Sequence, residues 1–94
     1  MEFVSNMDCI NPHTEAPIGP IPLYSASQIE TALASAAEGF AQWSGVALDE
    51  RSRRMRAVAG VLRRDRDVLS RLMAKEMGKP IAGGEQEVEK CAWT

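Results

Sequence analysis

The chain has 94 residues, of which 45% are hydrophobic and 26% are charged, with a formal net charge of −2 and a pI near 5.4. A chain of this length forms at most one small domain with a thin core. The acidic balance argues against a protein whose main task is to neutralise nucleic-acid phosphates, and the composition is that of a globular rather than a disordered chain.

The two cysteines, Cys9 and Cys91, lie far apart, without a CxxC motif or paired histidines. Neither a disulfide framework nor a zinc site is therefore indicated. The N-terminus lacks a basic start followed by a continuous apolar stretch, and no apolar window of about 18 residues occurs in the chain. These features predict a cytoplasmic chain with free thiols and no membrane partner.

Residues 1–24 contain clustered proline turn signals and predict an extended leader. Short strands are expected around Cys9 and Ile10 and from Ile18 to Tyr24, joined by a turn over residues 11–15. The prolines confine such a hairpin to the edge of a sheet, so we expect it to lie on another surface.

Helical periodicity begins at Ser25. A capping box is available either as Ser25 with Gln28 or as Ser27 with Glu30. The apolar residues that follow recur at steps of three and four and predict a helix with one buried face; they are Ile29, Ala32, Leu33, Ala36, Phe40 and Trp43.

A second helix is expected to begin at Asp49 as its N-cap, with Glu50 in the first turn, where the helix dipole favours a carboxylate. Its apolar stripe continues to Met77. Asp65 and Arg66 stand where that stripe needs an apolar residue, so we predict a bend or a break at this point.

Gly78 is expected to end this run in the left-handed conformation, and Pro80 to open a third helix. Gly83 and Gly84 should weaken the start of that helix by about 1 kcal/mol each relative to alanine. The sequence stops at Thr94 without a C-cap signal, which leads us to expect that it is part of something larger.

The densest charged feature is a group of seven arginines within sixteen residues. Such a stripe could bind phosphates, but acidic residues interleave with it and no aromatic side chain lies among the arginines to stack on a base. We therefore predict the solvated face of a surface helix and no nucleic-acid partner. The arginines are Arg51, Arg53, Arg54, Arg56, Arg63, Arg64 and Arg66.

The chain offers few candidates for reactive chemistry. Cys9 and His13 supply only two of the four ligands of a structural zinc site, and His13 is expected in a solvent-facing loop. A nucleophilic cysteine would need a nearby base and an oxyanion donor. Cys91 lies at helical spacing from Val88, which predicts a packing role.

Two further kinds of site are not indicated. Neither glycine-rich phosphate-binding motif occurs, and Gly78-Lys79-Pro80 is no substitute because Pro80 has no backbone N–H. The carboxylates of Glu85, Glu87 and Glu89 alternate around a helix and do not converge, so general acid–base chemistry is not indicated either. We assign no catalytic, cofactor-binding or metal-binding residue.

Several motifs nevertheless follow one another in a characteristic order. They are Ile10-Asn11-Pro12, the capped helix with Phe40, Ala41 and Trp43, Glu50-Arg51, Glu76-Met77-Gly78-Lys79-Pro80, Glu87-Val88 and Lys90-Cys91-Ala92-Trp93. From about Cys9 to Trp93 the chain resembles the N-terminal region of the aldehyde dehydrogenase superfamily, with the bacterial succinate-semialdehyde dehydrogenase type as the most similar. One departure is Glu15, which stands where the family commonly has glycine, so a tight turn with positive φ would be strained there.

The resemblance implies an α/β parent fold with a Rossmann-type NAD(P) domain and oxidation of an aldehyde, with succinate semialdehyde a candidate, to its carboxylic acid. Residues 1–94 would be an N-terminal part of the NAD(P)-binding domain, with 1–24 as a hairpin leader and 25–94 as three helices. NAD or NADP would serve the full-length enzyme. The family's catalytic cysteine, glutamate and cofactor contacts lie beyond this region, so this chain alone is expected to bind no cofactor and to be inactive. Some members hold a structural cation at positions corresponding to Cys9, Ile10 and Glu76.

Three hypotheses about partners stay open. In the first, the apolar faces meet the remainder of the parent enzyme or associate with themselves. In the second, the chain is a small helical interaction module without enzymatic activity, which docks a protein through the stripe of Ile29, Leu33, Phe40 and Trp43. In the third, the arginine stripe binds nucleic acid.

Overall fold

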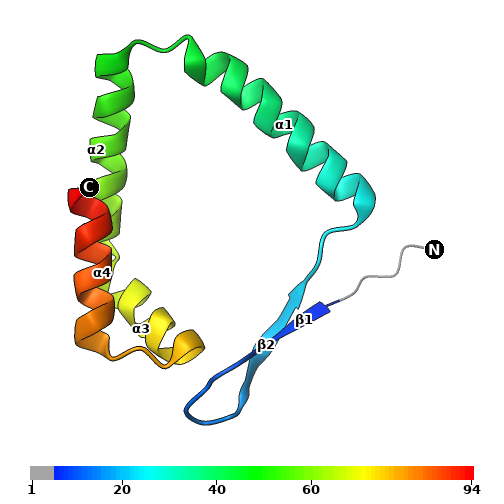
Figure 1. Ribbon diagram of the computed structural model, residues 1–94, viewed down its shortest axis with the longest axis vertical. Coiled ribbons are helices and arrows are strands. Elements are labelled where there is room, and N and C mark those ends of the chain that lie inside the picture. The colour runs from blue at the N-terminus through cyan, green and yellow to red at the C-terminus, as the bar shows by residue number, and fades with distance from the viewer. Residues whose placement is uncertain (1–5) are drawn as a thin grey trace.

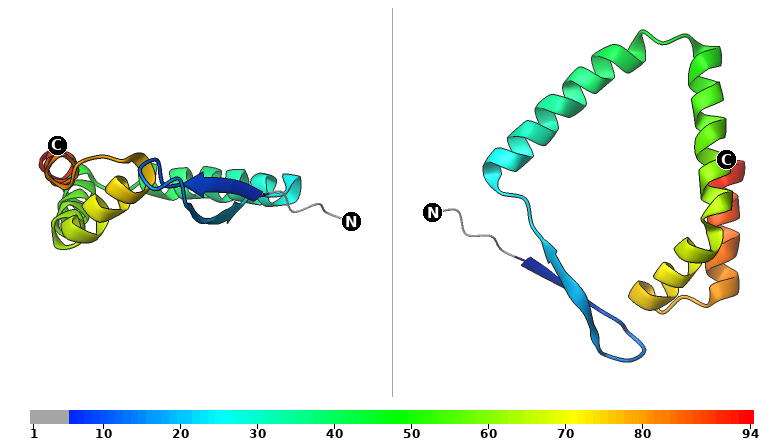
Figure 2. Two further views of the ribbon diagram at one scale, coloured as in Figure 1. Left: turned by 90° about the horizontal axis from the view of Figure 1, so that it is seen from below. Right: turned by 180° about the vertical axis from the view of Figure 1, so that it is seen from behind.

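The chain forms an open, flat frame (Figure 1). The computed structural model describes residues 6–94, which form strands β1 (Asn6–Ile10) and β2 (Pro17–Pro22) and helices α1 (Ala26–Ser44), α2 (Leu48–Arg64), α3 (Arg66–Met77) and α4 (Ile81–Trp93). Seen from the edge, the frame is a thin layer (Figure 2). Its extents are 47 × 45 × 14 Å and its radius of gyration is 17.7 Å. A compact chain of this length would have a radius of about 12 Å.

The expected leader is confirmed as an antiparallel hairpin. Its turn is held by Asn11, whose side-chain Oδ1 accepts hydrogen bonds from the backbone N–H groups of His13 (2.9 Å) and Thr14 (3.2 Å). Glu15 has a φ of +60°, so the glutamate does occupy the left-handed position where the family commonly has glycine. A non-glycine residue there carries a modest conformational cost.

Helix α1 begins as one of the two expected capping boxes. The Ser25 Oγ accepts from the Gln28 backbone N–H, while the Gln28 Oε1 accepts from the Ser25 backbone N–H at 2.8 Å. The expectation of a buried face is wrong for this chain, because every residue of α1 is exposed. Leu33 is 60% exposed and Phe40 71% exposed. The apolar stripe is present, but nothing in residues 6–94 covers it.

The second expected helix is two helices, so residues 25–94 contain four helices rather than three. Helix α2 begins at Leu48 with Ala47 as its N-cap, which corrects the prediction that Asp49 is the cap. Asp49 lies in the first turn instead, where its carboxylate still faces the positive end of the helix dipole. The predicted break is confirmed at Asp65, the single residue between α2 and α3.

The only packed region of the described chain is the corner formed by α2, α3 and α4. Its buried residues are Ser70 on α3 and Gly84, Val88 and Ala92 on α4. A Cβ on Gly84 would lie 3.1 Å from the Cβ and 3.2 Å from the Cα of Ser70, so α4 approaches α3 closely only because this residue is glycine. Gly84, which the sequence marks as a local weakness of the helix, is therefore the contact point of the two helices.

None of the helices in residues 6–94 is long and apolar enough to cross a membrane.

Candidate functional site

The hairpin turn meets the corner between α3 and α4. Gly78 ends α3 with a φ of +71°, which confirms the predicted left-handed end. A Cβ on Gly78 would lie 3.1 Å from Cγ of Pro12 in the hairpin turn. The motifs Ile10-Asn11-Pro12 and Gly78-Lys79-Pro80, far apart in sequence, thus touch in space. The hairpin turn and the α3–α4 corner meet there and close the frame (Figure 1).

A shallow groove runs along this joint. The polar and charged side chains that line it are Asn11, His13, Arg71, Lys75 and Lys79. Two of these cations have acidic partners: the Arg71 Nε lies 3.1 Å from Oδ2 of Asp67, and Lys79 forms an ion pair with Glu87. His13 is exposed, as predicted. The groove is basic, and His13 could accept a proton there, but the lining contains no cysteine or serine that it could activate as a nucleophile.

A second polar cluster holds the corner between α1 and α2. The Glu50 carboxylate accepts hydrogen bonds from Arg53 at 2.7 and 2.8 Å and from Arg54 at 3.0 Å. These hydrogen bonds lower the pKa of Glu50 to about 2, and the largest contribution comes from Arg53. The Arg54 guanidinium also lies 5.6 Å from the centre of the Trp43 ring, which is the geometry of a cation–π contact. The cluster therefore links the end of α1 to the start of α2.

Most of the arginine stripe is solvated, as predicted: six of its seven members are exposed, and Arg51 is half-buried. Several members pair with neighbouring carboxylates. The Arg63 Nε lies 3.1 Å from Oε1 of Glu89 and joins α2 to α4, and the Arg64 Nε lies 3.0 Å from Oδ1 of Asp65 at the break. Four of the seven arginines thus pair with carboxylates, and of these Arg63 joins two helices of the packed corner.

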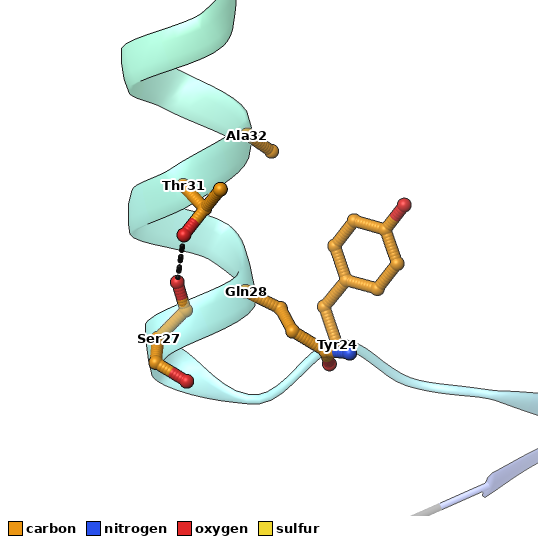
Figure 3. A pocket seen from close by; sticks show the side chains of 5 residues that line it. All are labelled: Tyr24, Ser27, Gln28, Thr31 and Ala32. Carbon is orange, nitrogen blue, oxygen red and sulfur yellow. Dashed lines mark hydrogen bonds between the residues drawn. The ribbon is translucent and has the colours of Figure 1, made fainter.

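A small hollow at the start of α1 has no counterpart in the sequence interpretation. It is lined by Tyr24, Ser27, Gln28, Thr31 and Ala32, and Figure 3 shows the Tyr24 ring standing over it. Thr31 Oγ1 donates to the Ser27 backbone oxygen at 3.0 Å. Because Gln28 is engaged in the helix cap, the hollow presents capping groups, hydroxyl groups and apolar surface, with no histidine or carboxylate in its lining to activate a hydroxyl. In the sequence, only the position of Tyr24 directly before the Ser25 cap could have indicated this hollow.

The two thiols are not brought together with a base. Cys9 is half-buried on β1, and Cys91 is exposed on α4, which corrects the prediction that it packs with Val88. The helix turns so that Val88 and Ala92 face α2 and α3 while Cys91 faces solvent. In residues 6–94 no group of three or more histidine, cysteine, aspartate or glutamate side chains is arranged to hold a metal ion.

These features describe a scaffold segment: a hairpin and four helices joined at specific corners, with apolar faces turned outward. The aldehyde dehydrogenase family model matches residues 2–94. The chain therefore belongs to the aldehyde dehydrogenase family and corresponds to its N-terminal region, as the motifs predicted.

Individual relatives agree with this assignment. The chain is 38% identical to a probable aldehyde dehydrogenase of a Pseudomonas species over 84% of its length, which is 16% of that protein. It is 36% identical to the succinate semialdehyde dehydrogenase [NAD(P)+] Sad of Escherichia coli over 88% of its length, which is 18% of that protein. It is 37% identical to a non-phosphorylating aspartate-semialdehyde dehydrogenase of Halomonas elongata over 84% of its length, or 16% of that protein. The chain thus spans less than a fifth of the length of these relatives.

Proposed function

We propose that this chain is the N-terminal scaffold of an NAD(P)-dependent aldehyde dehydrogenase that oxidises a semialdehyde, such as succinate semialdehyde, to a carboxylic acid. The observation that carries the proposal is helix α1, a capped and amphipathic helix whose whole apolar stripe is exposed. An amphipathic helix gains most of its stability by packing its apolar face. Further protein, which we take to be the remainder of the enzyme, is needed to cover it.

Several relatives support a semialdehyde substrate, because their names specify succinate, malonate and aspartate semialdehydes. The parent would have the α/β architecture of the family, with a Rossmann-type cofactor domain. The sequence contains no glycine-rich phosphate-binding motif, and Pro80, at the start of α4, has no backbone N–H to offer a phosphate. We therefore propose that the cofactor and the catalytic groups lie in other parts of the enzyme. The cytoplasmic location of the enzyme stays a prediction.

The role of this chain would be to position other elements. The hairpin, α1 and the packed corner form a continuous border, closed at the contact between Pro12 and Gly78. A border of this kind fixes the separation of its sides without supplying a reactive group. The alternative of an independent interaction module is not favoured, because the relatives named above are aldehyde dehydrogenases and the family model spans nearly the whole chain.

A chimeric enzyme tests this proposal. The matching segment of the Escherichia coli succinate semialdehyde dehydrogenase, which aligns with 83 residues of this chain at 36% identity, would be replaced by that part of this chain. We expect the chimera to form NAD(P)H when supplied with succinate semialdehyde, and the 94-residue chain alone to form none.

The matched controls are two chimeras that differ on α1. Leu33→Asp places a charge on the apolar stripe and should abolish soluble, active enzyme, because a buried unpaired carboxylate is costly. Glu38→Asp lies on the same helix but outside the stripe and should preserve activity. A Leu33→Asp chimera with full activity would show that the stripe meets no other part of the enzyme. Turnover by the 94-residue chain alone would contradict the scaffold role.

A further inference from the structure

A hollow in the corner between α1 and α2 combines apolar and cationic side chains. Trp43, near the end of α1, lines one side of it, and the first turns of α2 line the other. The α2 residues in the lining are Leu48, Arg51, Ser52, Met55 and Arg56. The hollow therefore presents two guanidinium groups beside apolar surface, and its lining contains no carboxylate.

Arg51 has a buried donor without an acceptor. Its Nε is closed off from solvent, and no atom of residues 6–94 accepts a hydrogen bond from it. Arg51 is also the one arginine of the stripe that is not exposed. A buried donor without an acceptor destabilises a fold, and the penalty is larger when the donor carries a charge. The Arg51 guanidinium therefore needs a partner.

Helix α2 itself does not supply this partner. Side chains face one another along a helix at steps of three and four, which is how Glu50 reaches Arg53 and Arg54. The residues at these steps from Arg51 are Ala47, Leu48, Arg54 and Met55, none of which is acidic. Asp49 and Glu50 stand two and one residues away, where side chains do not face each other. The acceptor must come from outside α2.

We infer that this hollow docks a carboxylate of the remainder of the enzyme, which binds the Arg51 guanidinium. The inference rests on the proposed function, because that function supplies the remainder. A carboxylate suits the site better than a backbone carbonyl, since it accepts from Nε and Nη together and neutralises the charge. Arg56, which has no carboxylate partner among the described residues, adds a second positive charge at the hollow.

The position of the hollow indicates which protein covers it. Trp43 lines the hollow and is also the last residue of the apolar stripe of α1, so protein that buries the stripe reaches the hollow as well. Figure 1 shows that α1 and α2 meet at one corner of the frame. This chain matches only 16–18% of each relative named above, so the parent enzyme has further protein to supply the carboxylate. The occupant presents an aspartate or glutamate to Arg51 and an apolar side chain to Trp43 and Met55.

A zero-length cross-link in the chimera with the Escherichia coli enzyme identifies the partner. Arg51→Lys places an amine at the hollow, and a carbodiimide joins an amine to a carboxylate in contact with it as an amide, while the carbodiimide takes up the water that is lost. We expect mass spectrometry to find this amide between position 51 and an aspartate or glutamate of the Escherichia coli part. The chimera with the natural Arg51 is the control, because its guanidinium does not couple.

Arg51→Met gives a second readout whose direction depends on assembly. In the chimera it leaves the partner carboxylate buried and unpaired, so we expect the melting temperature to fall by several degrees. In the 94-residue chain it removes the unpaired donor and keeps an apolar stem, so the melting temperature should stay the same or rise. Arg66→Met is the matched control: it removes an exposed arginine and should change neither value.

Two results would overturn the inference. One is an active chimera in which position 51 forms no cross-link, or forms one only to this chain's own sequence, which would assign the hollow to α2 itself or to a second copy. The other is an Arg51→Met change that lowers the melting temperature equally in the chimera and in the 94-residue chain.

The cross-link requires assembly but not turnover. A chimera that is linked at position 51 but forms no NAD(P)H would contradict the proposed oxidation and support the docking of the carboxylate. An active chimera without the link would do the reverse. A chimera that never becomes soluble would contradict both.

Discussion

Helix α1 and helix α4 belong to one chain but have opposite environments. Helix α4 has three buried residues, and Val88 is only 3% exposed, whereas α1 has none. Both helices are amphipathic and both begin at clear sequence signals. The difference shows that the apolar periodicity of a helix indicates which face must be buried. Whether that face is buried depends on the other elements that pack against the helix.

Glycine substitutions give the sharpest test of this contrast, because α1 contains the uncrowded Gly39 and α4 contains Gly84 at its contact with α3. Gly84→Leu on α4 should lower the free energy of unfolding by about 3 kcal/mol, since its side chain meets Ser70 in a close contact. Gly39→Ala on α1 has nothing within 4 Å of its new Cβ and should raise helix stability by up to about 1 kcal/mol. Urea unfolding followed by circular dichroism measures both. Equal effects at the two sites would remove the distinction between the helices.

The joint between the hairpin and the α3–α4 corner should show an intermediate effect. Gly78→Ala should cost about 1 kcal/mol, because alanine is disfavoured at positive φ. Gly78→Asn is the control: asparagine tolerates this conformation better, but its Cβ would still lie close to Pro12. If the asparagine variant is as unstable as the alanine variant in thermal unfolding, contact with the turn decides the cost. If it is as stable as the natural chain, backbone conformation decides it.

The smallest expected effect concerns the α1–α2 corner. The pKa of Glu50 is about 2 in the folded chain, below its ordinary value of 4.5. A depressed pKa stabilises the fold above the ordinary value, and this contribution is lost as pH falls from about 4.5 through about 2. Trp43 fluorescence should therefore change over this interval, because Arg54 loses its anchor beside the ring. Glu50→Gln should abolish the change, and a Trp43 signal that titrates equally in both chains would contradict it.

The sequence predicted the local structure well where side chains bond to their own backbone. The Ser25–Gln28 cap, the break at Asp65 and the left-handed end at Gly78 are determined within a few residues. It failed where the outcome depends on distant residues. The contact of Gly84 with Ser70 and that of Pro12 with Gly78 depend on helix orientation, which local propensity does not encode. Cys91 was misplaced because Cys91 and Ala92 both lie at helical spacing from Val88, and the orientation of α4 buries Ala92 and exposes Cys91.

No site residue was assigned from the sequence, and only the family motifs singled out the two segments that meet at this joint. The individual patterns of Ile10-Asn11-Pro12 and Gly78-Lys79-Pro80 gave no reason to bring them together, because a turn and a helix corner each have a complete local explanation. Their contact joins the two segments: the Pro12 ring of the turn lies against Gly78, which has no side chain in the way.

The layer that these elements form is 14 Å deep, little more than the diameter of about 10–12 Å of one helix with its side chains. A polypeptide layer of that depth cannot shield its peptide groups from both sides. Limited proteolysis and amide hydrogen exchange of the isolated chain would therefore proceed first along α1, where both flanks are open, and last at Ser70 and Gly84. Helix α1 would become protected from proteolysis and amide exchange once other protein packs against it, so its protection reports assembly directly.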